Sequence, residues 1–87
     1  MPFYVYLLLS SSKGRFFSYV GYSSNLQKRI KLHNLSKGAK YTKGKKWKLI
    51  YSKKISTKSL AMKEEYKLKK NYKLRKLIKH NYINKNK

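Results

Sequence analysis

Glu64 and Glu65 are the only acidic residues in the chain, so chemistry that needs a carboxylate depends on one of them. In the helix expected there, Glu65 falls on the same side as Ala61 and Leu68, while Glu64 is turned away by about a hundred degrees. A carboxylate on an apolar helix face is costly unless a charged partner meets it. The partner is either a nearby lysine or a hard cation such as Mg²⁺, which one or two carboxylates often hold together with waters and substrate phosphate. The periodicity favours neither interpretation.

The composition excludes several other kinds of site. Two acidic residues are too few for nucleases that gather several carboxylates around their metals. The absence of cysteine, with His33 and His80 as the only histidines, excludes disulfides and zinc sites of the Cys/His type. The absence of cysteine also fits a reducing cytosol, and the apolar run at residues 3–9 is too short to span a bilayer. We therefore expect a cytoplasmic protein.

Tyr6, Tyr19, Arg29 and His33 have side chains suited to proton transfer and phosphate binding. A strand tyrosine is usually a core or surface aromatic, but nearby cations can lower its pKa enough for it to accept a proton. Arg29 is one of three arginines among 24 basic residues, and its planar guanidinium can hold a phosphate through two hydrogen bonds. His33 lies four residues later, on the same side of the expected helix, where it could orient a ligand or carry a proton. A single histidine at a helix end is more often structural.

The net charge of +22 is the strongest indication of a partner. So many cations repel one another, and nucleic acid is the leading anionic partner because lysines neutralise phosphates and release counterions. An A+T-rich genome also raises the lysine content, but it does not explain why acidic residues are so rare. The lysines that we expect to contact nucleic acid are Lys13, Lys28, Lys37, Lys40, Lys43, Lys45 and Lys46.

The first elements that would position these residues are two strands. Residues 3–9 and 16–22 are apolar and rich in aromatic side chains, which is typical of strands. The turn chemistry of residues 10–15 joins them into a hairpin. Gly21 inside the second strand indicates a place where another backbone, or a ligand, approaches closely.

A helix and a basic loop follow the hairpin. Ser24 and Gln27 match a capping box, and the helix that it begins ends at about His33. Residues 34–46 contain glycines and lysines without an apolar period, which predicts a loop that becomes ordered when it meets its partner.

The last part of the chain predicts one strand and one or two helices. Residues 47–55 alternate well enough for a third strand with Trp47, Leu49 and Tyr51 on one face. A helix then runs to about Lys70, and a further helical segment follows it. The order is β-β-α-β-α(-α), an α+β fold in the form of an α/β sandwich.

Several of these residues form an ordered set that resembles the signature of the GIY-YIG nucleases. In chain order the set comprises Tyr4-Val5-Tyr6, Tyr19-Val20-Gly21, Arg29, His33, the stretch GAKYTKGKKW (38–47) and the stretch AMKEEYKLK (61–69). Over roughly residues 3–78 the chain is similar to the small stand-alone bacterial members of that superfamily, which are related to structure-specific resolvase nucleases. Each motif alone is weak, whereas the ordered set with its spacings is specific.

The resemblance implies a three-stranded antiparallel sheet flanked by helices, and it implies roles. Tyr6 and Tyr19 would lie beside the scissile phosphate, with Tyr6 as the general base in our prediction and Tyr19 supporting it. Arg29 would bind and polarise the phosphate, with His33 assisting beside it. Glu65 would hold one divalent metal, Mg²⁺ or Mn²⁺, that stabilises the leaving 3′ oxygen. Hydrolysis would leave a 5′ phosphate and a 3′ hydroxyl.

The chain departs from the family pattern in three places. Tyr4 replaces the first glycine of the signature. Tyr22 stands where many members carry a lysine, so that a lysine such as Lys13 would have to substitute. Leu77 stands where some members carry an asparagine, a role that is missing or taken by Asn71.

Two functions from different classes follow from the sequence. One is a metal-dependent DNA endonuclease, directed by DNA structure or backbone, in repair, recombination or DNA processing. The other is a catalytically weak or inactive nucleic-acid-binding module. A membrane-surface protein fits less well, because the lysines are spread along the whole chain. The joint presence of the catalytic set favours the enzyme: Tyr6, Tyr19, Arg29, His33 and Glu65.

The expected organisation is one nuclease domain at residues 1–80 and a basic polar tail at residues 81–87. No helix carries a pattern for reading bases, so we expect recognition of structure or backbone rather than of sequence. We expect a monomer that binds DNA, with RNA also possible. A partner protein could supply targeting, since a chain this short has little room to select its own target.

Overall fold

A two-residue turn folds the first part of the chain into a long hairpin. In the computed structural model, which describes residues 2–85, the hairpin consists of β1 (Phe3–Ser12) and β2 (Arg15–Ser23). Lys13 and Gly14 make the turn with φ angles of 52° and 78°, and positive values at both positions suit the twist of a tight hairpin. Both strands are longer than the sequence predicts, because pairing continues into the segment that its turn residues mark as a loop.

β3 (Lys48–Ile55) pairs with the other side of β1, which gives the sheet the order β2-β1-β3 with antiparallel neighbours throughout. The three-stranded antiparallel sheet and the α+β class are therefore confirmed. β1 is the central strand, and its residues 5–10 are buried. An unbroken apolar run suits this position, because helices cover both of its faces.

An irregularity in the pairing changes the face that β3 presents. Leu7 pairs with Tyr51 while its neighbour Leu8 pairs with Leu49, so β3 contains one extra residue at this point. Such a bulge reverses the alternation of side chains beyond it. Leu49 therefore shares a face with Leu8, and Tyr51 shares the opposite face with Leu7. The prediction that Trp47, Leu49 and Tyr51 lie on one face is wrong, because alternation alone does not reveal a bulge.

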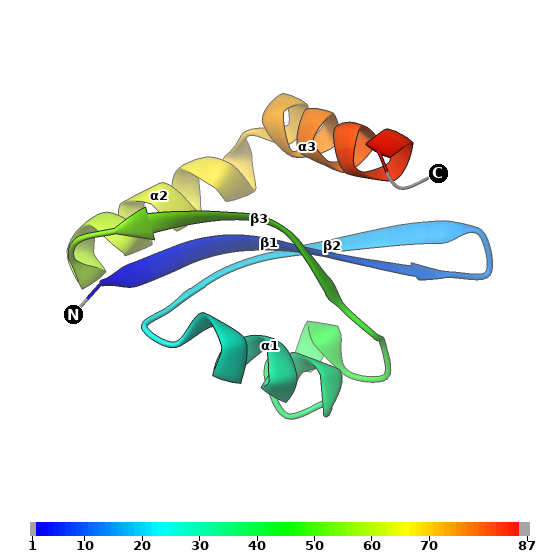
Figure 1. The fold of residues 1–87 in the computed structure, drawn as a ribbon, viewed down its shortest axis with the longest axis horizontal. Helices are drawn as coiled ribbons and strands as arrows, with labels where there is room; N and C mark the ends of the chain where they lie inside the picture. Colours follow the sequence, from blue (N-terminus) through cyan, green and yellow to red (C-terminus); the bar gives the residue numbers. More distant parts are fainter. Residues whose placement is uncertain (1, 86–87) are drawn as a thin grey trace.

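Helices cover both faces of the sheet and create three layers (Figure 1). α1 (Leu26–Asn34) lies on one face, while α2 (Lys58–Lys70) and α3 (Tyr72–Lys85) lie on the other. The order of elements agrees with the prediction. None of the helices within residues 2–85 is both long enough and apolar enough to cross a membrane.

Alternate residues of β1 face the two helical layers. Val5 and Leu7 belong to the hydrophobic cluster on the α2 side. Tyr6 and Leu8 pack with Trp47 in a second cluster, which α1 covers. The two-residue period of the strand thus directs Tyr6 towards α1.

The helix boundaries differ from the predictions in their details. Asn25 caps α1 by accepting a hydrogen bond from the backbone of Lys28 at 3.1 Å, so the predicted capping box at Ser24 does not form. Ser23 instead bonds to the backbone of Asn25, which leaves the extended strand one residue longer than expected. In α2 the cap is Thr57, one of two hydroxyl residues that precede this helix.

The segment between α1 and β3 is more structured than a basic loop. It contains a short 3₁₀ helix, η1 (Lys40–Thr42), and Thr42 is fully buried. At the other end of the chain, α3 includes residues 81–85, which we predict from the sequence to be a polar tail. Half-buried Tyr82 and Ile83 explain this difference, because they provide the helix with apolar contacts. The rest of the predicted tail, residues 86–87, lies outside the described residues.

Candidate active site

Tyr6 and His33 form a buried pair between β1 and α1. The Tyr6 hydroxyl lies 2.9 Å from Nε2 of His33, and the two residues are only 2% and 1% exposed. Two glycines provide the space: a Cβ atom at Gly21 would overlap the phenol of Tyr6, and one at Gly38 would overlap the imidazole of His33. The close approach that we predict at Gly21 is therefore made by a side chain, Tyr6.

Thr42 fixes the tautomer of His33. Its hydroxyl lies 2.9 Å from Nδ1 of His33 and donates its single hydrogen to the carbonyl of Ala39, also at 2.9 Å. The threonine oxygen must then accept a hydrogen bond from Nδ1–H, which leaves Nε2 as an acceptor. Tyr6 accordingly donates its phenolic hydrogen to His33. The result is a directed chain of hydrogen bonds from Tyr6 through His33 and Thr42 to Ala39.

The electrostatics keep this pair in its neutral form. Burial raises the pKa of Tyr6 above the usual range of phenols, and Tyr19 and Glu65 add to the rise, while Arg29 opposes it. Burial and the charge of Arg29 both lower the pKa of His33. Tyr6 therefore holds its proton and His33 stays uncharged, which is what the hydrogen-bond chain requires.

Of the two candidate catalytic tyrosines, Tyr6 and Tyr19, solvent reaches only Tyr19. Its ring lies 5.0 Å from that of His33, centroid to centroid, and it is half-buried where Tyr6 is buried. A base that takes a proton from water must have an accessible oxygen and a pKa near the working pH. Burial and a raised pKa both disfavour Tyr6 in that role, so the geometry fits Tyr19 better.

The charges of Arg29 and Glu65 both influence the pKa of Tyr6, although the two residues belong to different layers. Arg29 is exposed on α1, one turn before His33, and its charge acts on the pKa of both His33 and Tyr6. Glu65 belongs to α2, on the other side of the sheet, yet its charge also acts on the pKa of Tyr6. The two charged groups thus lie within electrostatic range of one phenol.

Glu65 has a lysine partner and remains a plausible metal ligand by its chemistry. Its carboxylate lies 3.3 Å from Nζ of Lys69, and its side chain is 19% exposed. Within residues 2–85, no three His, Cys, Asp or Glu side chains come together in a way that could hold a metal ion. A single carboxylate fits Mg²⁺ or Mn²⁺, because such hard cations keep several waters and are completed by substrate phosphates. Both partners that the sequence leaves open are compatible with this geometry.

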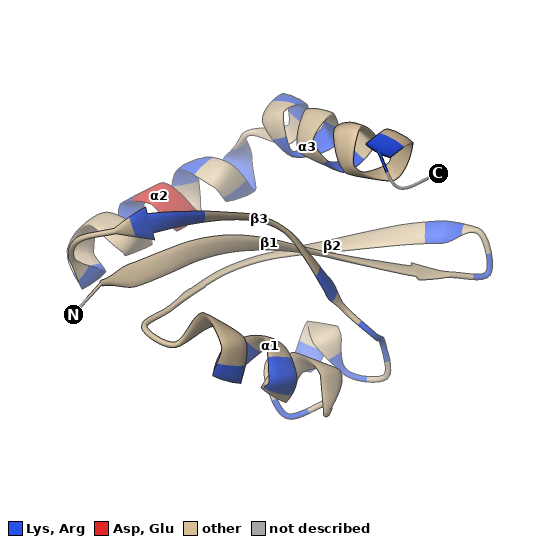
Figure 2. Cartoon of the chain, viewed as in Figure 1, with Lys and Arg blue, Asp and Glu red and all other residues tan. Residues whose placement is uncertain are grey.

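Most of the predicted lysines gather below the sheet (Figure 2). Six of them lie on α1 or between α1 and β3: Lys28, Lys37, Lys40, Lys43, Lys45 and Lys46. Lys13 instead lies at the hairpin tip, five residues beyond Leu8, the partner of Tyr19. At about 3.3 Å per residue this is roughly 16 Å away. The prediction that Lys13 substitutes for the missing lysine of the second motif is therefore wrong.

From the sequence alone, no functional role is predicted for the aromatic residues that lie beside Tyr19. Tyr41 stacks on Tyr19 with centroids 6.1 Å apart, and Trp47 lies 6.2 Å from Tyr41. Trp47 is buried and donates a hydrogen bond from its indole nitrogen to the carbonyl of Thr42. Tyr41, Thr42 and Trp47 all belong to the stretch GAKYTKGKKW, but this stretch has no apolar period from which their roles could be predicted.

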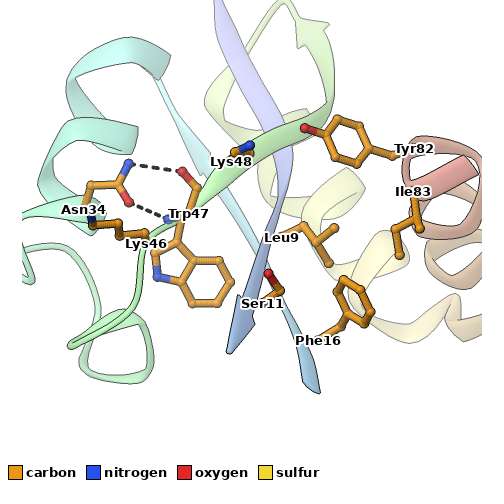
Figure 3. Close-up of a pocket in the computed structure, with 9 residues that line it drawn as sticks. All are labelled: Leu9, Ser11, Phe16, Asn34, Lys46, Trp47, Lys48, Tyr82 and Ile83. Atoms are coloured by element: carbon orange, nitrogen blue, oxygen red, sulfur yellow. Dashed lines mark hydrogen bonds between the residues drawn. The ribbon is translucent and has the colours of Figure 1, made fainter. Parts of the chain in front are cut away.

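The most prominent pocket of the structure lies outside the candidate site. A pocket of about 780 Å³ lies between α3 and the start of β3, with Leu9, Phe16, Trp47 and Tyr82 among its lining residues (Figure 3). Tyr6, Tyr19, Arg29, His33 and Glu65 are not part of its lining.

The catalytic-domain model of the GIY-YIG family matches residues 2–79. The chain belongs to the GIY-YIG family. Its relatives include the UPF0213 protein OB0043 of Oceanobacillus iheyensis, 41% identical over 85% of this chain and 84% of the relative. The UPF0213 protein SH2523 of Staphylococcus haemolyticus is 43% identical over 68% of this chain and 73% of its own. A solution NMR structure, of the UPF0213 protein BH0048 from Bacillus halodurans, is 35% identical with a TM-score of 0.47, covering 91% of this chain and 84% of that one.

Proposed function

We propose that this GIY-YIG protein is a metal-dependent endonuclease that hydrolyses phosphodiester bonds in DNA. The observation that carries the proposal is the buried hydrogen bond from the Tyr6 phenol to a neutral His33, beside the ring of Tyr19 and one helical turn after Arg29. A site that binds a phosphate and stabilises charge in the transition state needs a cation such as Arg29 close to positioned polar groups of this kind.

In the proposed mechanism, Tyr19 and Arg29 are the groups that touch the reacting atoms. Arg29 binds the scissile phosphate through its guanidinium and offsets the negative charge that grows on the phosphate oxygens. The phenol oxygen of Tyr19 accepts a hydrogen bond from the attacking water and aligns it. This assignment differs from our sequence-based prediction of Tyr6 as the base, for the reason of burial given above.

Tyr6 and His33 would act as positioning residues. His33 is held by hydrogen bonds at both ring nitrogens, so it cannot rotate freely. Its ring lies 5.0 Å from that of Tyr19, centroid to centroid, and would limit the positions that the Tyr19 ring can take. A water held to within a fraction of an ångström of its attacking position gains rate through orientation.

Glu65 would be the protein ligand of one divalent metal, Mg²⁺ or Mn²⁺. A metal bound there supplies Lewis-acid stabilisation of the negative charge on the leaving 3′ oxygen. The ion pair with Lys69 uses only Oε1 of Glu65, so the other carboxylate oxygen would be the metal ligand. Lys69 is 54% exposed, so the ion pair adds little stability that would oppose metal binding.

The substrate would be recognised through its backbone or shape. Lysines surround α1 and the segment after it, and phosphate contacts carry no sequence information (Figure 2). RNA stays an alternative substrate. Four further properties stay predictions: a role in repair, recombination or DNA processing, a targeting partner, a monomeric state and a cytoplasmic location.

A catalytically inactive binding module is the second candidate. Two observations favour it: Glu65 is already paired with Lys69, and Tyr6 is buried. Such a module would use the same basic surface without a metal.

Cleavage assays with matched variants distinguish the two. Branched, single-stranded and plasmid DNA are incubated with the protein in Mg²⁺ or in EDTA, and products are resolved on gels. We expect the wild type to cleave DNA in Mg²⁺ but not in EDTA. The Glu65→Gln variant should lose this activity. The control Glu64→Gln should keep it, because the carboxylate of Glu64 lies on another side of α2. DNA binding by Glu65→Gln should persist. Tight binding without cleavage of any DNA or RNA would overturn the proposal in favour of the binding module.

A further inference from the structure

Tyr41 presents a half-exposed aromatic ring beside the site. It is 51% exposed although its neighbour Trp47 is only 3% exposed. The ring stacks on Tyr19 with an interplanar angle of 21°, so it continues the aromatic cluster from the centre of the site towards the solvent. An aromatic ring that is half exposed to water contributes little to the stability of the fold. Its position is better explained by contact with a ligand.

The backbone that carries Tyr41 is held firmly in place. Thr42, the next residue, is fully buried and bonded to His33 and Ala39. The indole of Trp47 donates to the carbonyl of Thr42 at 3.0 Å. Tyr41 is therefore exposed on a rigid support and is pre-organised to receive a flat ligand.

The surroundings of Tyr41 carry cations and no anions. Nζ of Lys45 lies 5.4 Å from the ring centre of Tyr41 and 5.0 Å from that of Phe17. Lys40 and Lys43 flank Tyr41 in the chain, and both acidic residues lie elsewhere, on α2. Partly exposed cation–π contacts are weaker than the stacking of a nucleobase on an aromatic ring. A base can thus displace the ammonium group of Lys45, which is then free to pair with a phosphate.

We propose that Tyr41 is a stacking site for an unpaired nucleobase next to the phosphate that Arg29 binds. This inference rests on the proposed function and names its substrate class: nucleic acid with an unpaired nucleotide at the cleaved bond. Bases within a duplex are covered by their neighbours, so only an extruded or single-stranded base offers its face to Tyr41. The lysines bind phosphates in either case, whereas Tyr41 distinguishes an unpaired strand from a continuous duplex.

Binding measurements in EDTA test the inference without cleavage. One probe is a DNA duplex with a single unpaired 2-aminopurine, and the other is the same duplex with that base paired. The variants are Tyr41→Ala and Tyr41→Leu, the latter keeping apolar bulk without a ring. The control is Tyr72→Ala, which removes a tyrosine of α3 that is 62% exposed and also has cations over its ring.

The expected result is selective. Removing the ring should weaken binding of the unpaired probe by about 5- to 150-fold, the range for loss of one stacked base. Binding of the paired duplex should not change, and Tyr72→Ala should match the wild type on both probes. The fluorescence of 2-aminopurine should fall when the wild type binds and stay high with Tyr41→Ala.

Two results would overturn the inference: equal weakening of both probes, or no weakening of either. The outcome is separable from that of the proposed function. If the wild type cleaves DNA but the Tyr41 variants keep its preference among the probes, this inference alone fails. If the wild type binds the unpaired probe selectively through Tyr41 but cleaves nothing, the endonuclease proposal fails and this inference stands.

Discussion

The substitution Thr42→Val tests the hydrogen-bond chain most directly. Valine has nearly the shape of threonine, so it fills the same buried space without the hydroxyl. In the wild type, that hydroxyl accepts from Nδ1–H of His33 and donates to the carbonyl of Ala39. The carbonyl keeps a second donor, the backbone N–H of residue 42 at 3.1 Å. His33 has no replacement and is only 1% exposed.

The expected cost follows mainly from His33, because the other donor that loses the hydroxyl as its acceptor, the backbone N–H of Ala39 at 3.2 Å, is only half-buried. If His33 keeps its tautomer, Nδ1–H is buried without an acceptor. If the proton moves to Nε2, then Nδ1 is left without a donor and Tyr6 loses its acceptor. Either way at least one buried polar group is unsatisfied, at a cost of about 1–3 kcal/mol. For a domain of this size the melting temperature should fall by roughly 4–24 °C.

Two measurements check this prediction. Thermal unfolding followed by circular dichroism gives the change in melting temperature, with Thr42→Ser as the control that restores the hydroxyl. Nitrogen-15 NMR of the imidazole gives the tautomer, which should be Nδ1–H in the wild type. The reasoning would be refuted by an Nε2–H tautomer in the wild type, or by a Thr42→Val variant as stable as Thr42→Ser.

The remaining predictions use other properties of the site. Because folding lowers the pKa of His33, the unfolded state binds a proton at a higher pH than the folded state, so the stability of the fold should decrease as the pH drops below about 6.5. This decrease, measured as the melting temperature at several pH values, should disappear in His33→Asn and persist in the control His80→Asn. Gly21→Ala should displace the Tyr6 phenol and cost about 1–3 kcal/mol of unfolding free energy. A smaller cost in the Tyr6→Leu background, measured by a double-mutant cycle, would confirm that the phenol of Tyr6 is the obstacle. If the six clustered lysines each contact a phosphate, the affinity for DNA should fall with salt at a log–log slope of about −5; a nearly flat response in a salt titration would attribute the lysines to genomic composition.

The sequence predicts the sheet well and its irregularities poorly. The apolar, aromatic-rich runs of β1 and β2 and the alternation in β3 identify these segments as strands, because burial selects those patterns. The bulge in β3 and the helical state of residues 81–85 depend on contacts with other elements. Local patterns do not contain that information. The cap at Asn25 in place of Ser24 is a similar case, since both residues are good caps and the strand pairing of Ser23 decides between them.

The candidate site shows the same division. The types and spacing of Tyr6, Arg29 and His33 identify them as a group, and the structure brings Tyr6 and His33 into contact. Their roles follow from burial, which depends on space left by Gly21 and Gly38. Thr42 could not be found by its spacing, because its hydroxyl acts from a segment without any period.

In the proposed site, the carboxylate of Glu65 would have a role that the surrounding cations cannot take. Every phosphate-binding cation raises the local positive potential, which holds the substrate but does not by itself distinguish the leaving oxygen from the others. Glu65 lies on α2, which covers the face of the sheet opposite to α1, and its charge raises the pKa of Tyr6 whereas that of Arg29 lowers it. The proposed site would thus be polarised, with the guanidinium at one end and the metal-holding carboxylate at the other. Because its two ends come from different layers, the separation between them depends on the packing of both helices against the sheet rather than on any loop.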